Sequence, residues 1–160
     1  MDIGLISVRY ARALLKAGTE TNLEDKVYQE MMTLSESYLN VPELKFTIDN
    51  PMLSKEKKEK LFLTASGDEP CQLTKTFFKL VLKEDRESMM QFIANSYITL
   101  YRSQKKLIRA KLLTAMPVSS ITEQKLRKLV ESQTKGDVEF ETEINPNLIG
   151  GFILEYDTYR

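Results

Sequence analysis

The sequence predicts an α+β protein in which an N-terminal six-helix bundle is followed by a small β-α-β-β domain. Three observations lead to this prediction. Apolar residues recur every three or four positions through the first two thirds of the chain, which is typical of amphipathic helices. From residue 107 the period changes to two, which indicates strands. The chain also closes on two alternating segments that flank an Asn-Pro-Asn turn, so we place a helical domain at 1–104 and a smaller domain at 105–160.

Turn and capping signals divide the first domain into six helices. Gly18 is a typical C-terminal stop for the first helix. A short third helix ends before Pro51, because the residue that precedes a proline disfavours helical geometry. Ser54 is the expected N-cap of the fourth helix. The predicted helices cover 5–18, 23–39, a short stretch between 40 and 50, 54–64, 71–83 and 88–104.

The second domain begins with a strand near residue 107. Its apolar side is expected to carry Ile108, Ala110, Leu112, Thr114 and Met116. Ser120 and Glu123 have the spacing of a capping box, which predicts a helix that closes at 135–137. A strand at 138–144 then alternates Val138, Phe140, Thr142 and Ile144 inward with Glu139, Glu141 and Glu143 outward, and a last strand covers 151–156. We expect the glutamates to lie opposite Arg109 and Lys111, at a few tenths of a kcal/mol per pair.

The composition argues against catalysis. The chain contains no histidine, which removes the commonest general base and the commonest metal ligand. Cys71 is the one cysteine, so no internal disulfide or zinc site is expected, and we predict an inert, partly buried thiol. The 23 basic residues equal the 23 acidic ones, so no global charge attracts nucleic acid. We therefore predict no catalytic, cofactor-binding or metal-binding residues.

The hydropathy pattern predicts no membrane span. No apolar run reaches the roughly 18 residues that a spanning helix requires. The N-terminus lacks the basic region of a signal peptide and the arginine-rich character of a transit peptide. We expect the chain to stay in the compartment where it is made, and a single cysteine agrees with a reducing cytosol.

Two of the predicted helices are more apolar than burial of one face requires. The helix at 5–18 has a second apolar stripe formed by Val8, Ala11 and Leu15, and the helix at 71–83 repeats this pattern. Such helices either lie at the centre of their bundle or leave one face for a partner. Pattern alone leaves both alternatives open. In the second case the two helices jointly form a groove for an amphipathic helix.

Three further features have simpler interpretations than a functional site. The basic run Arg102, Lys105, Lys106, Arg109 and Lys111 has the charge to contact phosphates, but a solvated hinge is the favoured interpretation. The mixed charges from Lys55 to Lys60 indicate a solvent-facing helix surface. Gly150 and Gly151 lack the remaining residues of a nucleotide-binding loop, so we predict a tight turn there.

Four stretches of the chain carry a resemblance to a known family. They are the Tyr-Ala-Arg-Ala-Leu helix at 8–15, the Asn-Pro turn and lysine-rich helix at 50–61, the segment at 76–86, and the Asn-Pro-Asn and Gly-Gly signature at 144–154. In order and spacing they resemble the delta subunit of bacterial F-type ATP synthase, the family of the mitochondrial oligomycin-sensitivity-conferring protein. The resemblance covers essentially the whole chain.

This resemblance implies a non-catalytic stator subunit without a cofactor, present once per ATP synthase. It would be peripheral, on the cytoplasmic side of the bacterial cell membrane. The domain at 1–104 would bind the N-terminal helix of an alpha subunit on the catalytic head, and the domain at 105–160 would hold the b subunits of the peripheral stalk. The alpha-binding residues implied are Ile6, Tyr10, Ala13, Leu14, Ala17, Phe77, Leu80 and Val81. Family members usually continue into a further helix, so we expect the end at Arg160 to be a truncation.

The main alternative is a helical RNA-binding factor of the antitermination type. Such proteins also open with an arginine-rich Ala-Leu helix. This alternative predicts a strongly charged helical face and no β-α-β-β tail. An enzyme would instead require a closed pocket with a carboxylate pair or a lysine of shifted pKa.

Overall fold

The structure is a computed structural model that describes residues 2–134 and 136–157. Within these residues the chain forms seven α-helices, one short 3-10 helix and three strands. It divides into two compact units, Met1–Tyr101 and Arg102–Arg160. The combination of helices and a sheet agrees with the predicted α+β class.

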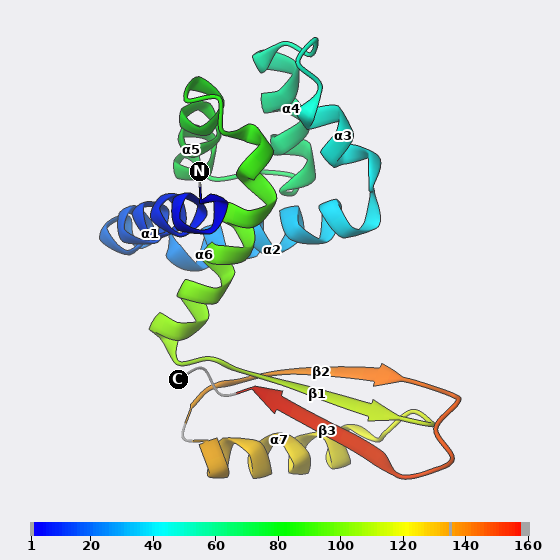
Figure 1. The fold of residues 1–160 in the computed structure, drawn as a ribbon. Coiled ribbons are helices and arrows are strands. Elements are labelled where there is room, and N and C mark those ends of the chain that lie inside the picture. Colours follow the sequence, from blue (N-terminus) through cyan, green and yellow to red (C-terminus); the bar gives the residue numbers. More distant parts are fainter. Residues whose placement is uncertain (1, 135, 158–160) are drawn as a thin grey trace. The chain divides into compact units, whose positions relative to one another are not determined.

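The helices of the first unit follow the predicted order (Figure 1). They are α1 (Ile3–Thr21), α2 (Glu24–Asn40), α3 (Glu43–Asp49), α4 (Lys55–Ala65), α5 (Gln72–Lys83), the 3-10 helix η1 (Glu87–Met89) and α6 (Met90–Lys105), whose last residues belong to the second unit. Ser54 caps α4 as predicted, because its Oγ accepts a hydrogen bond from the Lys57 N–H at 3.4 Å. The third helix ends at Asp49, before Pro51.

Gly18 does not end α1, which corrects one prediction. The helix continues to Thr21, and Asn22 then adopts φ 56° and donates its backbone N–H to the carbonyls of Gly18 and Thr19. Gly18 is buried, and a Cβ added there would lie 3.2 Å from the Glu24 Cα. Its small size therefore serves the close approach of α1 to the start of α2.

The core of the first unit is built from side chains of all its long helices. α1 packs against α2 and α5, and α4 packs against α5. Phe62 of α4 and Phe78 of α5 are fully buried, with ring centroids 5.2 Å apart. Tyr28 of α2 stacks on Tyr101 of α6 at 4.0 Å. The Tyr97 hydroxyl donates to the Glu24 carbonyl at 2.9 Å, and burial raises the pKa of Tyr97.

The prediction that the charged residues from Lys55 to Lys60 face solvent is wrong at one position. Lys58 is 4% exposed, and its Nζ lies 2.8 Å from Oε1 of Glu87 in η1. Lys55, by contrast, pairs with Asp85 at 2.7 Å while it stays half exposed. Sequence spacing did not indicate this buried ion pair, because Lys58 and Glu87 are distant along the chain.

Removing Lys58 is expected to destabilise the protein by about 3 kcal/mol, because Lys58→Ala leaves the Glu87 carboxylate poorly solvated without its partner. Urea denaturation of Lys58→Ala and of Lys57→Ala measures this effect. Lys57 is exposed, so its substitution serves as the control and should change the free energy of unfolding by less than about 0.5 kcal/mol. Equal losses in the two variants would contradict a stabilising role for the buried pair.

The second unit is a three-stranded mixed sheet with one helix (Figure 1). Its elements are β1 (Ile108–Thr114), α7 (Ser120–Thr134), β2 (Val138–Ile144) and β3 (Phe152–Asp157). The strand order is β2-β1-β3, with β1 parallel to β2 and antiparallel to β3. α7 packs on one face, over a core formed by Ile108, Ala110, Val130 and Val138 with Phe140 and Leu154 against it.

Two details of this unit differ from the predictions. The N-cap of α7 is Ser119 rather than Ser120, because the Ser119 Oγ accepts the Thr122 N–H at 3.3 Å. The inward face of β2 is buried only at Val138 and in part at Phe140. Thr142 and Ile144 are exposed, because the small core lies at the start of that strand.

The outer face of the sheet carries the predicted ladder of ion pairs. Arg109 lies 2.8 Å from Glu141, and Lys111 contacts Glu143. Each basic residue pairs diagonally, since in the strand register Arg109 faces Glu139 and Lys111 faces Glu141. Arg102 is 8% exposed and lies 3.3 Å from Glu139. The solvated hinge predicted for the basic run is therefore wrong at Arg102.

The ion pairs on the outer face of the sheet lead to a testable prediction for the pKa of Glu141. Its hydrogen bond from Arg109 lowers the pKa of this carboxylate below the ordinary glutamate value. A carboxylate whose pKa is lower in the folded than in the unfolded state stabilises the protein at pH values above the unfolded-state pKa. This stabilisation is lost as the pH falls through the folded-state pKa. We expect the Glu141 pKa to rise in Arg109→Gln, as measured by carboxyl-carbon NMR titration. An unchanged titration would contradict the pairing in solution.

Glycines in the second unit allow one close backbone approach and one stretch of positive φ. A Cβ on Gly136 would lie 2.6 Å from the Lys106 carbonyl oxygen, so the start of β2 approaches the start of β1 as only glycine permits. Gly150 and Gly151 have φ values of 125° and 75°, which side-chain-bearing residues rarely adopt. The chain bends at the Gly-Gly pair before β3, whereas the turn itself lies at Pro146 and Asn147.

Candidate functional site

The main candidate site is a groove of about 620 Å3 between α1 and α5, both in the first unit. Its lining is apolar apart from one arginine, one threonine and one glutamate. The residues that line it are Arg9, Tyr10, Ala13, Leu14, Ala17, Leu73, Thr76, Phe77, Leu80 and Glu84. We call this surface the α1/α5 groove.

The two apolar stripes of α1 have different surroundings. Ala11 and Leu15, from the second stripe, are buried in the core. Tyr10 and Ala17 are half-buried and Ala13 is exposed, and all three line the groove. Leu14 is buried and lies at the junction of the two surfaces. For α1, the sequence left a choice between a central helix and a helix with an open face, and the structure has the open face.

On α5, Phe78 and Val81 are fully buried in the core. Leu80 is 45% exposed and lines the groove, as does half-buried Leu73. Phe77 meets Tyr10 across the groove floor in an edge-on contact, with ring centroids 6.4 Å apart and an interplanar angle of 68°. This aromatic pair connects the two walls of the groove.

Six of the eight residues predicted for partner binding line this groove: Tyr10, Ala13, Leu14, Ala17, Phe77 and Leu80. Ile6 is half-buried and lies outside the lining residues. Val81 also lies outside, because its side chain faces the core. The prediction omitted Arg9, Leu73, Thr76 and Glu84. Helical spacing offered a signal for the last three, since each lies four residues from Phe77 or Leu80 on α5.

The chemistry of the groove suits binding rather than a reaction. Its two charged residues, Arg9 and Glu84, are single residues of opposite sign beside an apolar surface. Among the residues that the structure describes, no group of three or more His, Cys, Asp or Glu side chains is placed to hold a metal ion. An apolar channel with a few polar groups along it matches the surface that captures an amphipathic helix.

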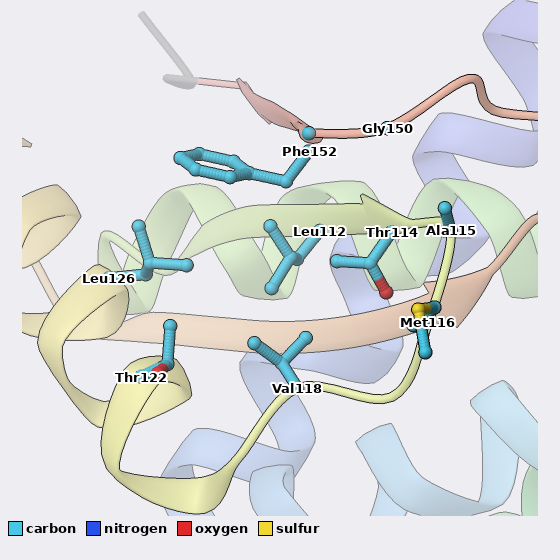
Figure 2. A pocket seen from close by; sticks show the side chains of 10 residues that line it. Leu112, Thr114, Ala115, Met116, Val118, Thr122, Leu126, Gly150 and Phe152 are labelled. Carbon is cyan, nitrogen blue, oxygen red and sulfur yellow. The ribbon is translucent and has the colours of Figure 1, made fainter.

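A second, smaller pocket of about 280 Å3 lies in the second unit. Figure 2 shows its side chains arriving from β1, from the loop that follows it, from α7 and from β3. Phe152 is more than half exposed beside this pocket, and Met116 is more exposed still. The Thr114 hydroxyl is buried and has no hydrogen-bond partner among the described residues. One helix therefore leaves part of this sheet face uncovered.

None of the helices in 2–134 and 136–157 has both the length and the apolar content needed to cross a membrane.

Comparisons with known proteins agree on one family. The family model described as ATP synthase delta (OSCP) subunit matches residues 6–159. The chain is 46% identical to the ATP synthase subunit delta of Phocaeicola vulgatus, over all of this chain and 87% of the relative. It is 40% identical to the same subunit of Parabacteroides distasonis, over all of this chain and 89% of the relative.

A solved structure supports the fold. A chain of the Toxoplasma gondii mitochondrial ATP synthase hexamer superposes with a TM-score of 0.63 at 21% identity, and the match covers 92% of this chain and 83% of that one. The delta subunit named by the sequence relatives is a structural subunit of ATP synthase rather than a catalytic one. The family model matches nearly the whole chain, and two relatives share enough sequence identity with it to indicate common descent. The fold agrees as well. We conclude that this chain belongs to the ATP synthase delta (OSCP) subunit family.

Proposed function

We propose that this chain is the stator adaptor of a rotary proton-translocating ATP synthase, in which the α1/α5 groove binds the N-terminal helix of an alpha subunit. The second unit attaches to the b subunits of the peripheral stalk. One copy sits on each complex, at the cytoplasmic side of the bacterial membrane. The adaptor transmits torque and catalyses no reaction.

The observation that carries this proposal is an apolar groove that is already open between two helices of one unit. An amphipathic helix presents apolar side chains at positions i, i+3, i+4 and i+7, which form a stripe of matching shape. Arg9 and Glu84 are available to pair with charges that flank such a stripe. Because the walls are helices with buried inner faces, little of the binding energy is spent on ordering them.

The pocket beside α7 supports the second half of the proposal. Exposed Phe152 and Met116 give the second unit an apolar surface on which helical b subunits can pack. Two attachments on one protein raise the effective concentration of each contact. Such an arrangement holds the catalytic head against rotation more firmly than either contact alone.

Calorimetric titration with a synthetic peptide of the cognate alpha subunit N-terminus tests the first contact. We expect saturable one-to-one binding, with a negative heat-capacity change because apolar surface is buried. A short RNA is the control for the alternative function. That alternative predicted no β-α-β-β tail, whereas the structure has one, and Arg102, Arg109 and Lys111 are ion-paired with glutamates. RNA binding without peptide binding would contradict the proposal.

A further inference from the structure

Glu30 of α2 is a buried acidic residue that does not line the α1/α5 groove. The residue is 3% exposed. Its Oε1 accepts the backbone N–H of Cys71 at 2.6 Å. Its Oε2 accepts a hydrogen bond from the Thr74 hydroxyl and lies 3.5 Å from the Cys71 Sγ. Lys26, one helical turn away, has its Nζ 3.8 Å from Oε1. Both oxygens of the carboxylate are therefore directed at the first turn of α5.

Glu30 adds an acceptor at the start of α5, a helix whose own N-cap side chain makes no capping hydrogen bond. Cys71 is the N-cap residue of α5, and its side chain makes no capping hydrogen bond. A helix leaves its first backbone N–H groups without partners inside the helix, and a negative charge near them is favourable. Glu30 supplies both the acceptor and the charge from another helix, across a sequence separation of 41 residues.

The geometry of the contact also determines how α5 is rotated. Cys71 and Thr74 are three residues apart, so they lie on the same side of the helix. Thr74 is fully buried, which places this side against the interior of the unit. Two hydrogen bonds to one carboxylate therefore hold the first turn of α5 at one depth and one rotation about its axis. Leu73, Phe77 and Leu80 project from the same helix into the groove.

We propose that Glu30 is a positioning residue for the α1/α5 groove: by holding the first turn of α5 on α2, it sets the position of the apolar side chains that receive the partner helix. This role rests on the proposed function, since it concerns affinity for the same helix. Glu30 itself does not line the groove. Its effect on binding is therefore indirect and passes through α5.

The test compares the full chain with Glu30→Ala, Glu30→Gln and the control Ile48→Ala. Ile48 is buried in α3, away from the groove lining, so it reports on lost stability alone. Glutamine is the conservative variant, because its carbonyl oxygen can still accept the Cys71 N–H and its amide N–H can donate to the Thr74 hydroxyl oxygen. Two quantities are measured: the affinity for the alpha-subunit peptide, and the methyl chemical shifts of Leu73 and Leu80 without peptide.

We expect Glu30→Ala to weaken peptide binding about tenfold, the equivalent of one lost helix cap, and to shift both methyl signals. Glu30→Gln should retain affinity to within about threefold, and Ile48→Ala should bind as the parent chain does despite its lower stability. If Glu30→Ala does not fold, Thr74→Val removes the hydroxyl donor at nearly the same volume and should weaken binding in the same direction.

Two results would overturn this role. One is parent-like affinity in folded Glu30→Ala or Thr74→Val, and the other is an equal loss of affinity in Ile48→Ala. If the parent chain does not bind the peptide, the proposed partner is wrong. The methyl shifts then still decide whether Glu30 positions α5, because unchanged Leu73 and Leu80 signals in Glu30→Ala would exclude it.

Discussion

Leu80→Glu is expected to weaken binding of the alpha-subunit peptide by at least about 100-fold, equivalent to about 2.7 kcal/mol. Leu80 is 45% exposed in the free chain and lines the α1/α5 groove. A docked apolar helix would cover the new carboxylate without offering it a partner, and burial of an unpaired charge is unfavourable. Calorimetric titration measures the change. The fold should survive, because the side chain already reaches solvent.

Gln29→Glu is the matched control, since it adds the same charge at an exposed position of α2 outside the groove. It should leave the affinity unchanged to within about twofold. Phe77 is a poorer choice for such a test, because it is buried and a charge there would also damage the core. Parent-like affinity in folded Leu80→Glu would refute the groove as the binding surface.

Phe78→Ala is expected to have the largest effect on stability, a loss of about 3–5 kcal/mol in the free energy of unfolding. The Phe78 ring is fully buried against Phe62 of α4, so its removal leaves a cavity where α4 and α5 pack. A domain of this size is stabilised by about 5–15 kcal/mol in total. Urea denaturation followed by far-UV circular dichroism measures the loss.

Leu80→Ala provides the comparison on the same helix. Because Leu80 is half exposed, its truncation should cost less than about 1 kcal/mol of stability. The two variants thus separate the two sides of α5, since one should affect folding and the other should affect partner binding. Similar stabilities of the two variants would mean that Phe78 is not part of the core in solution.

The order and type of the elements could be predicted from local patterns. The helical period, the Ser54 cap and the proline at residue 51 each act within a few residues, and the structure has helices where they indicate them. The change of period at residue 107 likewise precedes β1. Boundaries were less accurate, since Gly18 serves packing rather than termination and the cap of α7 lies at Ser119 instead of Ser120.

The side chains on α5 show where the pattern fails. Phe77, Leu80 and Val81 occupy neighbouring positions of one apolar surface, so spacing alone does not decide which of them faces the core. That choice depends on where α4 and α1 pack. The structure buries Val81 and leaves Leu80 in the groove, which is why the predicted list included a core residue of α5 that does not line the groove.

Local sequence patterns do not determine which distant residues come into contact. Glu30 meets Cys71, and Lys58 meets Glu87, only after the helices have packed. A charged residue within a helical sequence is usually solvent-exposed, so the sequence does not indicate that Glu30 or Lys58 is buried. The burial of both carboxylates is set by tertiary structure, and so is their influence on neighbouring elements.

The close approach at Gly136 has a consequence for the alignment of the parallel strands. The basic residues of β1 and the glutamates of β2 both repeat every two residues, so sliding β2 by two positions would form new ion pairs of the same kind and keep the same faces. Such a slip would bring Thr134 or Val138 to the place of Gly136, and either Cβ would collide with the Lys106 carbonyl. A residue without a side chain thus selects one pairing among several that charge alone would accept.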